Sequence, residues 1–175
     1  YSHLSVFDTT CGVRPTEVLT LHGHWPPDEF AGRIDAVARA YRGLYGIERN
    51  NHGLATILAC KRLGTPGLYE ERPVLSARGV VVELGKIGWT TTAVSKPMMI
   101  DELEQALRLF AVELRDESNL PELIFYQTQK DGKTGAPSGC WDDRVISLAI
   151  AIQMRKHLTA RFALPGALAG AERPR

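Results

Sequence analysis

The sequence has few cysteines and no long apolar run, and each shortage excludes a class of protein. Its three cysteines are Cys11, Cys60 and Cys140, an odd number without the spacing of metal ligands. This excludes a disulfide-stapled scaffold and a cysteine zinc site, and it favours a reducing, intracellular setting. No apolar stretch approaches the roughly 20 residues that a membrane-spanning helix needs, and we expect no signal peptide at the start. We therefore expect no membrane partner.

A dominant charge of one sign is also missing, because the formal net charge at pH 7 is +1. The charge is nevertheless uneven along the chain. Residues 39–78 contain seven Lys or Arg and three Glu, whereas residues 101–131 contain eight acids and three bases. A basic face beside an acidic one suits polyanion binding, but two solvated faces explain the same counts. The length of 175 residues, with 44% hydrophobic and 23% charged content, is typical of one globular domain with a sizeable core.

Alternating and helical periodicities divide the chain into two opening strands, followed by strands that alternate with helices. The expected strands cover residues 1–8, 17–22, 44–48, 68–71 and 79–84, and the expected helices cover 26–41, 52–63, 98–114 and a last one that starts at the pair Asp142-Asp143. Residues 120–129 suit either a helix end or a strand. This order predicts an α/β fold with a sheet covered by helices. We expect one domain over residues 1–157 and an Ala/Gly/Pro-rich tail or linker over 158–175.

Two adjacent carboxylates, Asp142 and Asp143, open the otherwise apolar last helix. One Asp at a helix start caps exposed N–H groups and suits the positive end of the helix dipole. Helical spacing places Asp142 above Val145 and Asp143 above Ile146, so that at least one carboxylate is carried toward buried surface. A carboxylate held there needs a cation, and a divalent metal is one candidate. An N-cap with a solvated neighbour is the alternative.

A further carboxylate, Glu48, closes the short apolar run at residues 44–47. If that strand lies centrally and the last helix packs on it, Glu48 meets the Asp pair. Two or three converging carboxylates without His or Cys select a hard cation such as Mg²⁺ or Mn²⁺. A pair of such ions about 4 Å apart activates water and stabilises the leaving oxygen of a phosphodiester, which is nuclease chemistry. An ion pair of Glu48 with Arg49, or its contact with a nearby helix end, is the structural alternative.

An ordered set of short motifs carries a resemblance to a known family. The set comprises Ile47-Glu48-Arg49-Asn50-Asn51-His52-Gly53, Gly88-Trp89-Thr90-Thr91, Ser95-Lys96-Pro97-Met98-Met99-Ile100, Lys133, and Gly139-Cys140-Trp141-Asp142-Asp143-Arg144-Val145. Together they resemble the nuclease domain of phage large terminases over residues 1 to about 154. The resemblance implies a ribonuclease H-like mixed sheet flanked by helices, related to the Holliday-junction resolvases. It also implies a metal-dependent endonuclease that cuts concatemeric double-stranded viral DNA during genome packaging.

The same resemblance implies the site residues, cofactors and partners. Glu48 resembles the second catalytic acid of the family, and the pair Asp142 and Asp143 resembles its third acidic motif. We favour Asp142 as the main ligand because small Ala149 on its stripe permits a closer approach to the sheet. The implied cofactor is Mg²⁺ or Mn²⁺, as two ions, and the implied DNA contacts are Arg49, Lys96 and Lys133. The implied partners are double-stranded DNA, an upstream ATPase domain of the same polypeptide, the portal and the small terminase subunit, on a procapsid in the host cytoplasm.

Two departures from the family pattern leave alternatives open. The first acid of the family lies on an opening strand that would precede Tyr1, so this acid falls outside the sequence, with Asp8 as the nearby substitute. Trp141 stands where many relatives carry a histidine. A catalytically inert module that guides DNA or docks on the procapsid therefore remains an alternative, as does a resolvase-like nuclease of branched DNA.

Overall fold

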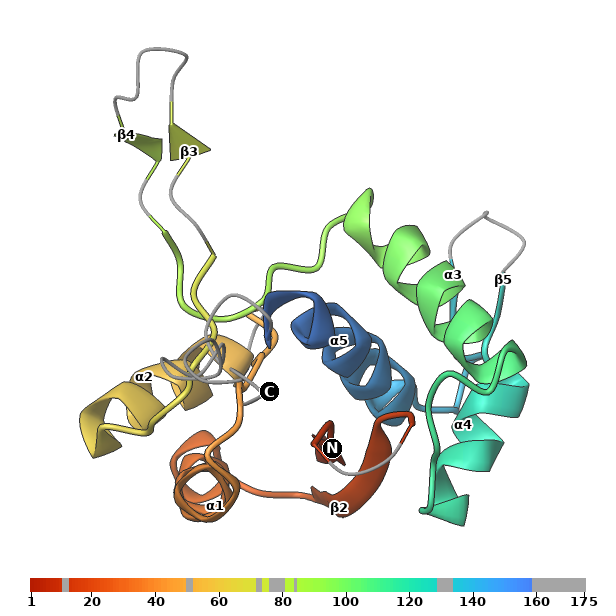
Figure 1. Ribbon diagram of the computed structural model, residues 1–175, viewed down its shortest axis with the longest axis horizontal. Coiled ribbons are helices and arrows are strands. Elements are labelled where there is room, and N and C mark those ends of the chain that lie inside the picture. Colours follow the sequence, from red (N-terminus) through yellow and green to blue (C-terminus); the bar gives the residue numbers. More distant parts are fainter. Residues whose placement is uncertain are drawn as a thin grey trace, which may run out of the picture.

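The fold is a set of short paired strands around a central helix, α5, with further helices on both sides (Figure 1). The computed structural model describes residues 1–10, 13–49, 52–71, 74–75, 81–83, 85–128 and 134–158. The helices are α1 Pro27–Tyr41, α2 His52–Leu63, α3 Ser95–Arg108, α4 Leu120–Phe125 and α5 Asp143–Leu158, with a 3₁₀ turn η1 at Glu117–Asn119. The strands are β1 Ser2–Asp8, β2 Thr16–Gly23, β3 Val74–Leu75, β4 Val81–Glu83, β5 Gln127–Thr128 and β6 Thr134–Gly135.

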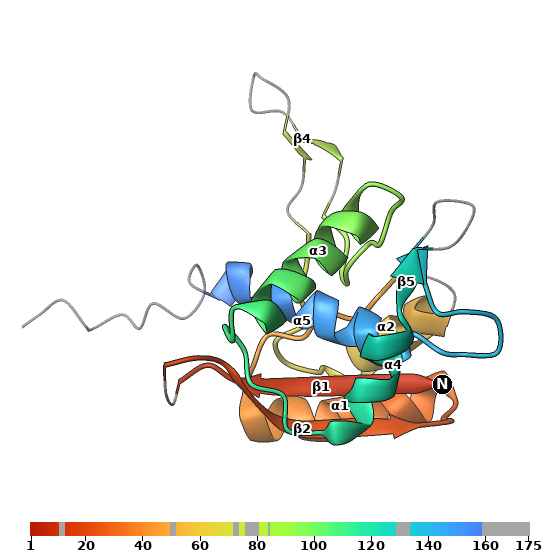
Figure 2. The same cartoon turned by 90° about the vertical axis from the view of Figure 1, so that its right-hand side faces the viewer.

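The long hairpin β1–β2 is the largest strand pair that the structure describes. Its register pairs Ser2 with Gly23 and Leu4 with Leu21, and it shifts by a bulge between Val6 and Phe7. Figure 2 shows α5 lying along one face of β1, with α3 beyond it. The helices α1 and α2 pack against each other. The hairpin therefore carries the helix that begins with the acid pair.

Single bridges extend the strand pairing beyond the named strands. The segment at residues 44–48 bridges Leu68 through Tyr45 and bridges Trp89 through Glu48, both in parallel. Glu70 bridges Ile87 in antiparallel fashion, and Thr16 of β2 bridges Glu113 in parallel. The strands expected at 44–48 and 68–71 are thus extended segments that pair through isolated bridges. The expected strand at 79–84 overlaps β4, and residues 79, 80 and 84 lie outside the described residues.

The apolar side chains form two clusters. One lies between α3 and α5 and is built from Tyr69, Met99, Leu103, Val145, Leu148, Ala149, Ile150 and Met154. The other lies between α1 and α2 and is built from Phe30, Ala31, Ile34, Ala38, Tyr45, Ala59 and Cys60. The spacing of Phe30, Ile34 and Ala38 is the one-face periodicity that predicted α1. No described helix combines the length and apolarity that a bilayer crossing requires.

Helix α3 differs most from its expected limits, since it begins at Ser95 and ends at Arg108 instead of covering 98–114. Its start is fixed by exchanged hydrogen bonds, in which the Thr92 backbone N–H donates to Ser95 Oγ (2.8 Å) and the Ser95 N–H donates to Thr92 Oγ1 (3.0 Å). At its end Phe110 takes a left-handed conformation, with φ of 51°. The chain then leaves the helix and pairs with β2 through Glu113. The prediction of a helix to Leu114 was therefore wrong, because the chain leaves the helix after Arg108 and Glu113 pairs with Thr16 of β2.

The ambiguous stretch at 120–129 contains both of the structures that were considered. It forms the short helix α4 and then β5, which pairs with β6. Leu158 ends α5, and residues 159–175, which carry most of the expected tail, lie outside the described residues.

Candidate functional site

The acid pair stands where a tight turn enters α5. Gly139 has φ of +84°, and the Cys140 N–H donates to the Pro137 carbonyl at 2.9 Å. Asp142 immediately precedes the helix, and its carbonyl accepts the Ile146 N–H at 2.9 Å. Asp143 is the first helical residue. The two carboxylates therefore occupy the positive end of the helix dipole, as the sequence predicted.

A buried charged network holds this helix start in place. The Arg144 N–H donates to Glu122 Oε2 at 2.8 Å, and the Arg144 guanidinium donates to Asp116 Oδ2 at 2.9 Å. Arg144 is only 9% exposed. The same guanidinium lies 3.3 Å from Asn119 Oδ1, and its Nε lies 3.7 Å from Glu122 Oε1. The position of the acid pair is thus set by residues just C-terminal to it.

The network continues into β2 through Glu17, which is 2% exposed. Its carboxylate accepts the backbone N–H groups of Arg115 and Asp116 at 3.0 Å and the Asn119 side-chain amide at 3.2 Å. Burial raises the pKa of Asp116, but hydrogen bonds from Ser118, Thr20 and Arg144 outweigh it and hold that pKa well below its usual range. Sequence reasoning missed this network. Its only local sign in the sequence is the arginine that follows Asp142 and Asp143. The partners of Arg144, which are Asp116 and Glu122, lie more than 20 residues earlier in the chain.

The Lys96 ammonium and the backbone nitrogen of Tyr1 lie beside the two carboxylates. Lys96 Nζ is 3.6 Å from Asp142 Oδ2, and the amino nitrogen of Tyr1 is 3.8 Å from Asp143 Oδ2. Asp143 Oδ2 is buried and has no hydrogen-bond partner within the described part of the chain. Burial raises the pKa of Asp143, and the negative charge of Asp142 raises it further. As expected, at least one carboxylate of the pair is carried toward buried surface.

Glu48 is placed by the extended segment at 44–48. The Trp89 N–H donates to the Ile47 carbonyl (2.7 Å), and the Arg49 N–H donates to the Trp89 carbonyl (2.8 Å). The Arg49 guanidinium donates to the Ile87 carbonyl at 3.0 Å. Among the described residues no ion pair joins Arg49 to Glu48. The ion pair with Arg49 is therefore not formed in the described chain, whereas the start of α2 does lie against the Glu48 backbone, since a Cβ on Gly53 would meet the Glu48 carbonyl oxygen.

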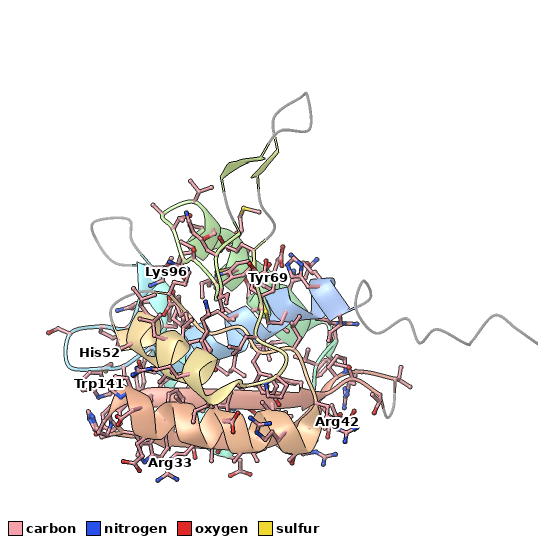
Figure 3. All side chains as sticks on the ribbon, turned by 90° about the vertical axis from the view of Figure 1, so that its left-hand side faces the viewer. Arg33, Arg42, His52, Tyr69, Lys96 and Trp141 are labelled. Atoms are coloured by element: carbon pink, nitrogen blue, oxygen red, sulfur yellow. The ribbon has the colours of Figure 1, made fainter. Side chains whose placement is uncertain are left out.

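A cavity of about 970 Å³ brings the three sequence-predicted acids onto one surface. Its lining includes Glu48, His52, Thr91, Lys96, Asp142 and Asp143. Figure 3 shows Lys96, His52 and Trp141 toward the same end of the molecule. In the described ranges, however, no three His, Cys, Asp or Glu side chains are close enough to hold a metal ion. Of the DNA contacts expected from the sequence, Lys96 lines the cavity, Arg49 bonds to the Ile87 carbonyl, and Lys133 lies outside the described residues.

The same cavity runs between β1 and the 44–48 segment. The backbone groups of Tyr45 and Ile47 bond toward residues 67–69 and 89, so alternation turns those of Leu44 and Gly46 away from these residues, while the Glu48 carbonyl lies against Gly53 at the start of α2. Within the part of the chain that the structure describes, no bridge joins these two edges. Residues of β1 and Leu44, Gly46 and Glu48 all line the cavity. The cavity is therefore flanked by two extended segments that are not paired with each other among the described residues.

Asp8, the substitute for the missing first acid, lies at the far end of β1. Its Oδ1 accepts the backbone N–H and the hydroxyl of Thr10, both at 2.7 Å. This is the hydrogen bonding of a turn-starting Asp. Tyr1, which contacts Asp143, lies about 20 Å away along the strand at a strand's usual rise per residue. Asp8 is therefore placed away from the acid pair.

Comparison with solved structures identifies the fold. The chain is similar to the large terminase nuclease from the thermophilic phage G20c with bound cobalt, with a TM-score of 0.54 and 15% identity over 86% of this chain and 81% of that chain. The same nuclease with bound magnesium matches with a TM-score of 0.52, 15% identity and the same coverage. No protein-family model and no curated protein sequence matches the chain. The expected α/β fold and the likeness to terminase nucleases are thereby confirmed.

Proposed function

We propose, on the premise that the chain has the fold of large terminase nuclease domains, that it is the nuclease module of such a terminase and cuts double-stranded viral DNA. One observation carries this proposal beyond the fold. Glu48, Asp142 and Asp143 come from two distant segments and line a single cavity beside Lys96. Carboxylates gathered without His or Cys ligands are the donor set of a hard divalent cation.

The groups around Asp142 and Asp143 suit the binding of a divalent cation. Asp143 Oδ2 is buried without a hydrogen bond in the described chain, and the Lys96 ammonium lies 3.6 Å from Asp142 Oδ2. The site thus places a positive charge beside an acid pair that has an unsatisfied carboxylate oxygen. Glu48, Asp142 and Asp143 would hold Mg²⁺ or Mn²⁺, and the similar nucleases were solved with cobalt and magnesium. A bound cation of this kind supplies activation of water and stabilisation of the leaving oxygen in phosphodiester hydrolysis.

A further carboxylate is needed to complete the donor set, since Glu48, Asp142 and Asp143 do not form a preassembled three-acid cluster among the described residues. We place it on a strand that pairs in the groove between β1 and the 44–48 segment and is supplied by residues ahead of Tyr1. The cavity between β1 and the 44–48 segment supports this placement, because both line it and no bridge joins them in the described chain. The contact between the Tyr1 amino nitrogen and Asp143 would bring the preceding residues to the acid pair.

The chain's own basic residues would hold the DNA backbone. Lys96 stands beside Asp142 with its ammonium partly exposed, and it would bind the phosphate next to the scissile bond. Contacts of this kind position DNA without reading its sequence, so we expect low sequence specificity. An ATPase domain upstream in the same polypeptide, the portal and the small terminase subunit would be the partners, on the procapsid in the host cytoplasm.

Plasmid nicking with Mn²⁺ tests the proposal in the full polypeptide that contains this chain. We expect Glu48→Gln and Asp142→Asn each to lower the cleavage rate by at least about a hundredfold, because each removes a metal ligand. Glu104→Gln is the matched control, since Glu104 is an exposed acid paired only with Arg108 at 3.9 Å. Unchanged cleavage in the Glu48→Gln, Asp142→Asn double variant would refute the site.

The inert module is the second candidate, favoured by the lack of a preassembled three-acid cluster among the described residues. The same assay separates the two functions, because an inert module leaves plasmid intact while still retarding DNA in a gel. Adding a four-way junction as substrate separates the terminase reading from a resolvase-like nuclease. A resolvase would cut the junction in preference to the linear duplex.

A further inference from the structure

An exposed aromatic cluster, made of Tyr1, His22, His24 and Trp141, stands beside the acid pair. The Tyr1 ring stacks on His22 with centroids 5.0 Å apart and planes 13° apart. It also lies 3.9 Å from the His24 ring and meets Trp141 edge-on at 5.3 Å. Four rings from three segments of the chain therefore meet at one place on the surface.

The cluster is exposed to an extent that packing does not explain. Trp141 is 56% exposed, and both histidines are exposed as well. The other two tryptophans, Trp25 and Trp89, make packing or hydrogen-bond contacts within the fold. Trp25 stacks on Phe30 with the Arg33 guanidinium over its ring, and Trp89 Nε1 donates to Met99 Sδ. Trp141 thus leaves much of its indole surface open to a ligand.

The position of the cluster relates it to the acid pair. Trp141 immediately precedes Asp142, and the Tyr1 amino nitrogen lies 3.8 Å from Asp143 Oδ2. Successive residues are about 3.8 Å apart along the chain, and successive nucleotides of a duplex advance by about 3.4 Å. A base that adjoins a phosphate held at the acid pair is therefore within reach of these rings.

The chemistry of the cluster suits a base better than a phosphate. Its rings present π-faces, whereas the cationic group that suits a phosphate is the Lys96 ammonium beside Asp142. Aromatic side chains bind bases by stacking, and this stacking tolerates any sequence because every base has a π-face. A base inside an intact duplex keeps its faces covered by its neighbours, so only an unstacked base can use such a surface.

We propose that the aromatic cluster binds an unstacked base next to the scissile phosphate, so that the preferred substrate is DNA that is locally unpaired at the cut. This inference rests on the proposed nuclease function and names a substrate feature of the same site. The cluster acts as a clamp on one nucleotide, and Lys96 acts on the phosphate beside it.

Binding assays without cleavage test this inference in the full polypeptide. A fluorescently labelled duplex is compared with the same duplex carrying two central unpaired bases, in Ca²⁺ to suppress cutting. We expect the protein to prefer the unpaired duplex, and Trp141→Ala to lower that preference by about fivefold or more while duplex affinity stays constant. Trp141→Phe should keep most of the preference, because it keeps a stacking ring. His24→Gln, a second variant in the cluster, should lower it partially.

Phe110→Ala is the matched control, since Phe110 is 74% exposed and follows the end of α3, about 20 Å along the helix from Lys96. Tryptophan emission adds a second readout, in which wild type is quenched by the unpaired duplex and Trp141→Phe is not. The inference is overturned if Trp141→Ala retains the preference, loses affinity for both duplexes equally, or if wild type shows no preference. If the acid variants lose cleavage but a correctly folded Trp141→Ala cuts the unpaired duplex at the wild-type rate, this inference alone is refuted. The proposed nuclease function would then stand.

Discussion

Lys96 Nζ lies 3.6 Å from Asp142 Oδ2, and about one third of each side chain is exposed. The two residues come from the first turn of α3 and from the entrance of α5, so the contact joins two helices at the mouth of the acid-lined cavity. The lysine ammonium balances part of the charge of the carboxylate. A divalent ion bound by Asp142 would have to share the carboxylate with this ammonium or displace it.

Replacing Lys96 by Met should therefore strengthen metal binding and weaken DNA binding. We expect the Mn²⁺ concentration at half-saturation to fall by about two- to fivefold, because a like charge a few Å away is removed at a partly screened site. DNA affinity at low salt should fall, since a phosphate contact is lost. Calorimetric metal titration and gel retardation measure the two effects. Lys61→Met on α2 is the control, and a Lys96→Met variant that binds Mn²⁺ more weakly would contradict this account.

Divalent metal should raise the thermal stability of the folded chain. At a free metal concentration one hundred times the dissociation constant, binding to the folded state alone adds about 2.7 kcal/mol to the free energy of unfolding. Thermal melting with and without Mg²⁺ or Mn²⁺ measures this directly. We expect the shift to disappear in Asp142→Asn and in Asp143→Asn, and EDTA should reverse it. An equal shift in those variants would place the metal elsewhere.

Arg144 should be among the most costly residues to replace. The Arg144→Met change leaves Asp116 and Glu122 without their buried counter-charge, and removing one partner of such a pair costs about 3–5 kcal/mol of unfolding free energy. Urea denaturation measures the loss. Arg108→Met is the control, because its pair with Glu104 is exposed and 3.9 Å long and should be worth less than about 1 kcal/mol. Equal losses in both variants would show that the network contributes no more than a surface pair.

The elements that could be predicted from the sequence are those with a local cause. Phe30, Ile34 and Ala38 repeat at helical spacing and are all buried in α1. The acid pair lies at the start of α5 because an apolar periodic run follows it directly. The opening strands likewise follow from alternation, and β1 and β2 pair over nearly their full length.

The elements that could not be predicted have causes distant in the chain. The apolar pattern continues past Arg108, but strand pairing of Glu113 with Thr16 ends α3 early. Glu17 accepts hydrogen bonds from residues about one hundred positions later, and no periodicity reports such a partner. The aromatic cluster similarly depends on the hairpin bringing Tyr1 beside His22 and His24. Roles for Glu48, Asp142 and Asp143 remain predictions that the cleavage assays address.

Stability should fall on mild acidification because His3 is largely buried. Burial, followed by the positive charge of Arg144, lowers the pKa of His3 from 6.5 to about 4. At pH values between about 4 and 6.5, His3 is therefore protonated in the unfolded chain and neutral in the folded chain. The free energy of unfolding therefore falls as the pH drops from about 6.5 toward 4. We expect roughly 2 kcal/mol of the unfolding free energy to be lost between pH 7 and pH 5 through this residue. Urea titrations at both pH values measure it; His3→Gln should flatten the difference, whereas His52→Gln, at an exposed histidine, should not.

Gly53 should prove indispensable for the position of Glu48, because a Cβ at Gly53 would overlap the Glu48 carbonyl oxygen. Backbone cannot yield as a flexible side chain does, so Gly53→Ala must push the start of α2 away from the 44–48 segment. We expect a loss of stability of about 1–3 kcal/mol, together with reduced cleavage beyond what partial unfolding explains. Gly32→Ala is the matched control, since nothing lies within 4 Å of its added Cβ and the change should stabilise α1 by up to about 1 kcal/mol. Cleavage rates measured well below both melting temperatures separate displacement of the carboxylate from unfolding. If Gly53→Ala cuts DNA at the wild-type rate there, Glu48 does not need its present backbone position.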